Sequence, residues 1–373
     1  MPEWVLFVGG ILLFLAILSV LVALHEAGHM IAAKKLGLYV PEYSVGFGPS
    51  LFHKKWGTTT YHLRAFPLGG YVLIEDETQE KGSYERGALS WVPPWKRQIV
   101  FVAGPAVNIV LGVVILFATL MSFPYQAGTN VVEKLQTCSA GACGSLEAGL
   151  EVGDTVVSID GTTVTNLDEI AAAKEGKSEI SVVVERDGET LTKEVKLEKD
   201  TAMMGIVVTL ADRWRTFPET VGFIGDTLKQ NIQATINLPD KVVPVAQSIV
   251  TGERPADAPG SVVSVGKRYG DVAAAPESET GNKLYTYLIY TALFSLGIGF
   301  LNLLILPPLD GSRMLIAFVD SCRKWFSKVR NKAYSPVGRR AYLAFASVGA
   351  FVVFGFMGLL IFSDFSLIFA GNL

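Results

Sequence analysis

Residues 4–35 read WVLFVGGILLFLAILSVLVALHEAGHMIAAKK, an apolar run that continues without a break into three ionisable side chains. An apolar helix of about 20 residues is long enough to cross a bilayer. His25, Glu26 and His29 stand at the end of this run, where ionisable groups are costly unless they pair or bind something. The stretch therefore predicts a membrane-spanning helix that carries a functional site.

The spacing of these side chains indicates what they could bind. At roughly 100° per residue, His25 and His29 lie one turn apart on nearly the same face of the helix, so both imidazoles can reach one ion. Glu26 points about 100° away from His25, which suits it to hold a metal-bound water rather than to be a ligand. The H-E-x-x-H pattern is typical of zinc hydrolases. The alternative, a pair of interfacial histidines at a helix end, leaves Glu26 unexplained in an apolar setting.

The composition indicates several membrane spans and one water-exposed domain. Hydrophobic residues make up 50% of the chain, and long apolar runs alternate with a central stretch that is charged, Gly-rich and strand-like. No A-x-A-like cleavage site follows the first apolar run, so we interpret this run as a retained span and not as a signal peptide. The lipid bilayer is the expected environment, and no nucleic-acid partner is expected.

The segment after the first span predicts a β region associated with the membrane. Short alternating runs broken by Gly and Pro favour strands and tight turns, and open sheet edges are not tolerated against lipid. Gly69 and Gly70 let another backbone come close, and the run from Tyr71 to Ile74 favours a strand. We expect this edge to pair with an unwound substrate; the alternative is an edge paired only within its own sheet.

Three further polar residues lie in or near the predicted membrane region. His53 and His62 belong to the β region, where polar side chains at a wet interface are the favoured interpretation. Asn108 lies in the motif AGPAVNIVLG of the second apolar run. Its side chain could hold two helices together or contact a substrate, and this stretch favours neither alternative.

The central stretch contains four short motifs: Ala148-Gly149-Leu150, Val152-Gly153-Asp154, Ile159-Asp160-Gly161 and Gly205-Ile206. In these motifs it resembles a PDZ domain of the circularly permuted bacterial kind. The resemblance implies peptide capture by strand addition on a closing strand, with Gly205 and Ile206 in the binding position. The alternative is a small β domain that acts as a spacer or plug.

The expected fold class is therefore a polytopic α-helical membrane protein with about four transmembrane helices, a membrane-associated β-sheet and an inserted extracytoplasmic PDZ-like domain. In chain order, the expected segments are the first transmembrane helix with HEAGH (1–35), the β region (36–97), the second transmembrane helix (98–124), the PDZ-like domain (125–208), amphipathic helices and a linker (209–283), the third transmembrane helix with the LDG motif (284–312), a basic cytoplasmic segment (313–340) and the fourth transmembrane helix (341–373).

The charge distribution predicts how the chain is oriented. The segments after the first and third spans are basic and should face the cytoplasm, whereas the PDZ-like region is acidic and should face outward. The first and third spans then both descend towards the cytoplasmic face, which brings His25, His29 and Asp310 to one depth. Two imidazoles and one carboxylate are the ligand set of a catalytic zinc with an open position for water.

Five motifs are spread over nearly the whole chain: HEAGH, GFGPSL, PLGGYV, GPAVN and NLLILPPLDG. In these motifs the chain resembles a bacterial site-2 protease, an intramembrane zinc metalloprotease of the regulator-of-sigma-factor type. The resemblance implies Zn²⁺ on His25, His29 and Asp310, Glu26 as the base, and Asn108 and Asn302 as residues that handle the substrate.

The family pattern also implies the biological setting of the protein, and this sequence departs from the pattern at two positions. Expected substrates are single-span membrane proteins already trimmed by a site-1 protease, such as anti-sigma factors, or signal-peptide remnants, in the inner or plasma membrane. Ile305 stands where the family usually has Pro, which bears on how the helix is broken beside Asp310. Ser261 replaces the usual Pro after Gly260, which bears on how the linker docks.

Two alternatives from other classes are a metal transporter and a catalytically idle PDZ-containing chaperone. A transporter requires ionisable residues at several depths across the membrane, whereas the ionisable residues of this chain are expected at one depth. The catalytically idle chaperone is disfavoured because the sequence retains all four residues expected for catalysis: His25, Glu26, His29 and Asp310.

The remaining functional expectation concerns the cysteines. Cys138 and Cys143 lie in a short loop outside the cytoplasm, where a disulfide is permitted, and two free thiols are the alternative. Cys322, on the basic side, should remain a thiol.

Overall fold

The computed structural model describes residues 3–74, 87–138, 141–142, 144–197, 204–253, 259–275 and 283–369. The chain divides into two compact units. The first comprises Met1–Thr119 and Val221–Leu373, and the second comprises Leu120–Thr220.

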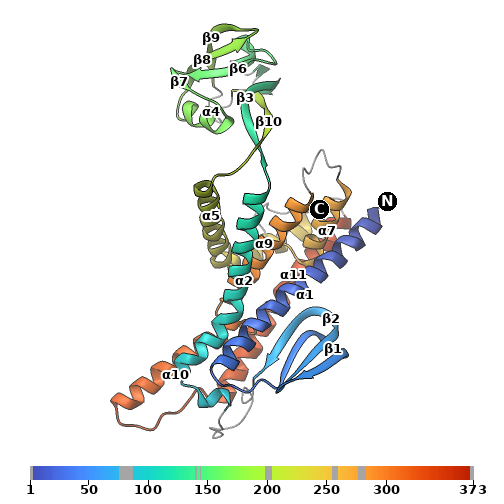
Figure 1. Ribbon diagram of the computed structural model, residues 1–373, viewed down its shortest axis with the longest axis vertical. Helices are drawn as coiled ribbons and strands as arrows, with labels where there is room; N and C mark the ends of the chain where they lie inside the picture. Colours follow the sequence, from blue (N-terminus) through green and yellow to red (C-terminus); the bar gives the residue numbers. More distant parts are fainter. Residues whose placement is uncertain are drawn as a thin grey trace. The chain divides into compact units, whose positions relative to one another are not determined.

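Long apolar helices dominate the first unit (Figure 1). Among the described residues, four helices are long and apolar enough to cross a membrane, which confirms the expected number. These helices are α1 (Glu3–Lys35), α2 (Pro94–Ser122), α9 (Lys283–Asn302) and α11 (Arg339–Phe369).

Small residues bring three of these helices into close contact. A Cβ atom at Gly28 of α1 would lie 2.6 Å from the carbonyl oxygen of Ala103 in α2. A Cβ atom at Gly299 of α9 would lie 3.0 Å from the carbonyl oxygen of Pro105, also in α2. Close backbone approach at small residues is how helices pack in lipid, where no hydrophobic force drives them together. Helix α2 therefore lies against both α1 and α9.

Shorter helices connect the second unit to α9. They are α5 (Phe217–Ile236), the 3₁₀ turn η2 (Leu238–Lys241), α6 (Val242–Thr251) and α7 (Val262–Ala274). Buried Asp364 of α11 accepts hydrogen bonds from the backbone N–H groups of Ser261 (2.8 Å) and Ser264 (3.3 Å), at the start of α7. A carboxylate at a helix N-terminus satisfies otherwise unpaired donors. Ser261, at the position where the resemblance implies a proline, thus supplies an N–H that proline lacks.

A bent two-stranded sheet packs against α1 and is formed by β1 (Glu42–Trp56) and β2 (Thr59–Leu73) (Figure 1). Residues 42–45 of β1 pair with residues 60–63 of β2 on one side and with residues 70–73 of β2 on the other. Gly46 and Gly48 bend β1 with φ angles of 85° and 84°, a region that favours glycine. Residues 70–73 form an edge: within the described part of the chain no further strand pairs with their outer side.

The helix break beside Asp310 is present although Ile305 replaces a proline. Helix α9 ends at Asn302, and α10 (Asp310–Val329) starts after a non-helical connection that includes Pro307 and Pro308, which have no N–H to donate. Within the segment expected to hold the third span (284–312), α9 ends at Asn302 and α10 begins at Asp310, and α10 continues through much of the expected basic segment (313–340). Short η1 (Leu89–Trp91) precedes α2.

The second unit is a small β structure around its own core. Its strands pair in the order β10-β3-β6-β8-β9, with β7 added to β6 and β10 at one edge, and β4 and β5 form a separate hairpin. Buried aliphatic residues such as Val156, Ile159 and Val182 fill the core. The elements are β3 (Tyr125–Leu135), β4 (Thr137–Cys138), β5 (Gly141–Ala142), α3 (Gly144–Glu147), β6 (Thr155–Ile159), β7 (Thr162–Thr163), α4 (Leu167–Lys174), β8 (Glu179–Arg186), β9 (Glu189–Lys196) and β10 (Ile206–Arg213).

The disulfide predicted between Cys138 and Cys143 lies outside the described residues, because Cys143 is not among them. Cys322 of α10 is a free thiol, as expected.

A buried ion pair fixes the loop before β6. The Arg186 guanidinium donates to both carboxylate oxygens of Asp154, at 2.6 and 2.9 Å, and Asp154 also accepts from the backbone N–H of Glu151. The hydrogen bonds from Arg186 hold the pKa of the Asp154 carboxyl below its ordinary value. The pair therefore stabilises the folded unit fully above the unfolded-state pKa of Asp, about 3.9, and this contribution is lost as the pH falls through the folded-state pKa.

We predict that Arg186→Met lowers the free energy of unfolding of the second unit by about 2 kcal/mol near neutral pH, because Asp154 then lacks its charged partner. The loss should shrink as the pH falls below about 4, where Asp154 becomes protonated in the variant. Hydrogen exchange over residues 144–197 of the full-length protein in detergent measures it. An equal loss at pH 3 and pH 7 would contradict the role of the ion pair.

Candidate metal centre

Three side chains from two helices converge at the end of α1. Asp310 Oδ2 lies 3.0 Å from His25 Nε2 and 3.2 Å from His29 Nε2, and the two Nε2 atoms are 3.2 Å apart. The histidines are one turn apart on α1, and Asp310 is the first residue of α10. The charge distribution of the sequence predicted these three residues at one membrane depth. Among the described residues, they are the one group of at least three His, Cys, Asp or Glu side chains close enough to share a metal ion.

The triangle of atoms fits a tetrahedral metal ion. Ligand atoms about 2.0 to 2.1 Å from zinc lie about 3.3 Å from one another in such a site, close to the separations observed here. His29 Nδ1 lies 2.7 Å from the Val100 carbonyl oxygen, so this nitrogen carries the proton that is donated. In a neutral ring Nε2 is then an acceptor that faces the Asp310 carboxylate, and a cation between them satisfies both groups.

Helix α2 leaves room for the two imidazoles at one position. A Cβ atom at Gly104 would lie 2.8 Å from His25 Nε2 and would overlap His29 Nε2. Val100, Gly104 and Asn108 are spaced at i, i+4 and i+8 and therefore form one stripe of α2. Asn108 is fully buried, and its Nδ2 lies 3.3 Å from His25 Nδ1. Val100 and Asn108 thus meet the Nδ1 atoms of the two histidines, and Gly104 faces their Nε2 atoms.

The sheet edge lies beside Glu26. A Cβ atom at Gly70 would lie 3.3 Å from Cγ of Glu26, so the edge formed by residues 70–73 passes next to this carboxylate. Tyr43 of β1 donates a 2.5 Å hydrogen bond to the carbonyl oxygen of Ala23, less than one turn before His25. Burial raises the pKa of the Tyr43 phenol to about 12, which keeps it a donor. Tyr43 therefore fastens the sheet to the end of α1.

Polar side chains on the sheet form a separate network. The hydroxyl of Tyr71 donates to Glu42 at 2.5 Å, Arg64 donates to both residues, and His62 lies 3.7 Å from Glu42. Burial raises the pKa of the Glu42 carboxyl, but the hydrogen bonds from Tyr71 and Arg64 outweigh it, so the pKa lies below its ordinary value. His53 stacks on His62 with ring centroids 5.7 Å apart. These histidines belong to the surface of the sheet and not to the candidate metal centre.

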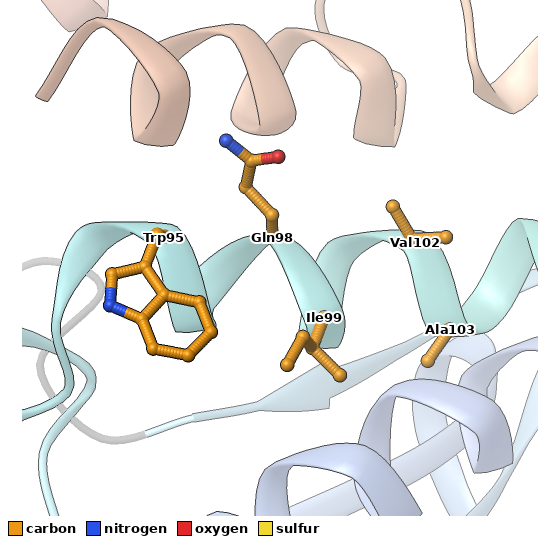
Figure 2. Close-up of a pocket in the computed structure, with 5 residues that line it drawn as sticks. All are labelled: Trp95, Gln98, Ile99, Val102 and Ala103. Atoms are coloured by element: carbon orange, nitrogen blue, oxygen red, sulfur yellow. The ribbon is translucent and has the colours of Figure 1, made fainter. Parts of the chain in front are cut away.

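A different face of α2 lines an apolar groove of about 480 Å³. Figure 2 shows its lining side chains, with Gln98 and Val102 on one side of the helix and Ile99 on another. None of the lining residues is ionisable. The groove is thus distinct from the stripe that contacts the histidines.

The other predicted site residues lie outside the triangle. Asn302 is the last residue of α9 and is half-buried. Gly205 and Ile206 belong to the second unit, where Ile206 begins the edge strand β10. Sequence reasoning missed Val100 and Tyr43, whose contacts depend on folding and leave no signal in the local pattern. The position of Gly104, four residues before Asn108, is visible in the sequence, but its contact with the imidazoles is not.

Two imidazoles at the end of an apolar helix, a carboxylate from a second helix and an adjacent glutamate are a side-chain set that could hold a metal ion in a membrane metalloprotease. The model of the family described as Peptidase family M50 matches residues 13–346. The chain therefore belongs to this family, the site-2 proteases, and is a zinc metalloprotease and a multi-pass membrane protein.

Similar proteins carry names that agree with this assignment. The zinc metalloprotease Rip1 of Mycobacterium bovis is 31% identical over 96% of this chain and 98% of its own length. The zinc metalloprotease Rip1 of Mycobacterium tuberculosis is 30% identical over the same shares of the two chains. The protein of the same name from Mycolicibacterium smegmatis is 28% identical over 95% of this chain and 97% of its own length.

We predict that Gly104→Ala abolishes zinc binding, because the added methyl group occupies the space of the histidine Nε2 atoms. The matched control is Gly297→Ala in α9, where a Cβ atom would meet nothing within 4 Å. Zinc content per purified chain is the measurement. Full zinc content in Gly104→Ala would mean that the two histidines do not hold the metal in this arrangement.

Proposed function

We propose that this zinc protease cleaves single-span membrane proteins within or near the membrane, with a metal held by His25, His29 and Asp310. The observation that carries the proposal is the triangle of ligand atoms at the end of an apolar helix, with Glu26 on the next residue. Zinc held there would polarise the scissile carbonyl group and make a water molecule nucleophilic near neutral pH.

Glu26 is the proposed general base. Its carboxylate accepts the proton of the attacking water and returns it to the leaving nitrogen, so one group serves both halves of the peptide hydrolysis. Glu26 is half-buried and lies against Gly70 of the sheet edge. A peptide laid along residues 70–73 would therefore pass beside the base.

The substrate has to be extended before it can be cut, because a helix hides its backbone in its own hydrogen bonds. We propose that Gly69, Gly70 and Tyr71 present the free edge of the sheet to the unwound segment. The one-sided pairing of residues 70–73 within the described structure supports this role. The Tyr71 side chain is already bonded to Glu42 and Arg64, so its backbone would make the contact. Asn302, where α9 ends, is a further proposed substrate contact.

The second unit is proposed to be a PDZ-like domain outside the cytoplasm. Its support is β10, an edge strand that follows Gly205 and begins with Ile206, as strand addition requires. The metal centre would lie near the cytoplasmic face of the inner or plasma membrane, because the basic residues cluster around α10. Proposed substrates are anti-sigma factors already cut by a site-1 protease, or signal-peptide remnants.

Glu26→Gln tests the proposed base. We predict that the variant keeps its zinc and loses cleavage of a tagged single-span substrate by about 10²- to 10⁴-fold, since an amide fills the same space but cannot accept the proton. Asp310→Asn should instead weaken zinc binding, since an anionic ligand is lost. Zinc content and product formation are measured on the same samples.

Two outcomes would contradict these roles. If Glu26→Gln loses its metal together with its activity, Glu26 is not the base proposed here. If Asp310→Asn retains both zinc and cleavage, the third ligand lies elsewhere in the chain. A wild-type protein that binds zinc and shortens no single-span substrate would point to a peptide-presenting function instead.

A proline scan tests the sheet edge. Successive N–H groups of a strand point to opposite sides, so proline placed through residues 69–74 should impair cleavage at alternate positions while zinc content stays unchanged. A uniform loss along the scan, or one that follows zinc loss, would mean that the strand only holds the fold.

A further inference from the structure

The two proposed histidine ligands are oriented by the same helix. Each ring presents Nε2 to the triangle and Nδ1 to α2, where His29 Nδ1 meets the Val100 carbonyl oxygen at 2.7 Å and His25 Nδ1 meets Asn108 at 3.3 Å. A metal-binding imidazole normally donates its other N–H to an acceptor, which fixes the tautomer and the ring plane. Val100 supplies such an acceptor to His29. The same chemistry requires an acceptor at His25 Nδ1.

The carboxamide of Asn108 has that acceptor within reach. Its Nδ2 stands next to His25 Nδ1, while its Oδ1 is buried and has no hydrogen-bond partner. If His25 Nε2 binds the metal, Nδ1 carries the proton, and two donors would then face each other. Rotating the carboxamide by 180° exchanges oxygen and nitrogen in the same volume. The oxygen then accepts from Nδ1–H, which removes both the donor clash and the unpaired buried oxygen.

The surroundings hold Asn108 in place for this contact. The Asn108 side chain is fully buried, and Ser295 of α9 donates a 2.8 Å hydrogen bond to the backbone carbonyl oxygen of Asn108. Gly299, one turn further along α9, packs against the Pro105 carbonyl oxygen. Helix α9 thus braces the part of α2 that faces His25. A substrate contact would need an exposed carboxamide, and this one is covered.

We propose that Asn108 is the positioning residue of His25: its carboxamide oxygen accepts from Nδ1–H and fixes Nε2 towards the metal. This inference rests on the proposed ligand set and changes the role expected for Asn108, which the family pattern assigned to the substrate. Asn108 acts through His25 and does not touch the reacting atoms. The pair Val100 and Asn108 makes α2 the orienting helix for both imidazoles.

Asn108→Leu and Asn108→Asp test the proposal with Zn²⁺ alone as the probe. Leucine fills a similar volume without an acceptor, so the zinc dissociation constant, measured by chelator competition in detergent, should rise roughly 10- to 100-fold. Aspartate keeps the acceptor and should bind zinc at least as tightly as the wild type. At saturating zinc, KM for a single-span substrate should stay within a factor of about two of the wild type in both variants.

The control variant is Asn302→Leu, which should leave zinc affinity unchanged because Asn302 is proposed to contact substrate only. Unchanged zinc affinity in Asn108→Leu with a raised KM would overturn the proposal in favour of a substrate contact. Equal zinc loss in Asn108→Leu and Asn108→Asp would overturn it in favour of packing. His25→Ala is included because a wild-type zinc affinity in that variant would refute the ligand set itself, which is a separate failure.

Discussion

The close approach of α2 to the end of α1 is the constraint on which the first unit depends. Gly104 leaves the space that the two imidazoles occupy, and Val100 and Asn108, one turn to either side, meet their Nδ1 atoms. Any side chain at position 104 would push the helices apart and break both contacts together. The proposed ligand geometry is therefore set by helix packing as much as by the H-E-x-x-H pattern.

Several buried polar groups in the helical unit meet a specific partner on another helix. Asp364 would be an expensive charge in an apolar helix, but it accepts from two backbone N–H groups at the start of α7. Ser295 bonds to the Asn108 carbonyl oxygen, and Ser248 bonds to Ser363. These contacts connect helices that are distant in sequence, because lipid offers a polar group no other partner.

The contacts of the two-stranded sheet with the end of α1 are a second constraint on the candidate metal centre. Tyr43 fastens β1 to the carbonyl oxygen of Ala23, and Gly70 lies against Glu26. An unpaired strand edge is a liability in most proteins because it captures other strands. Beside a proposed catalytic base, that property serves the function, since the scissile segment must be extended. The proposed metal ligands, the proposed base and the strand edge therefore lie close together in the first unit.

The sequence by itself determined the apolar helices, the one-turn spacing of His25 and His29 and the family motifs, because these depend on local periodicity and on residue type. The positive-inside rule also predicted one depth for Asp310 and His25, and the structure places the two side chains in contact although 285 positions separate them. Only the tertiary structure decided that α9 stops at Asn302, that residues 70–73 form the sheet edge, and that Asn108 faces His25. Those outcomes depend on which helix and strand surfaces pack together closely enough for atoms about 3 Å apart to contact. Neither the hydropathy of a segment nor the spacing of its residues along the chain specifies this packing.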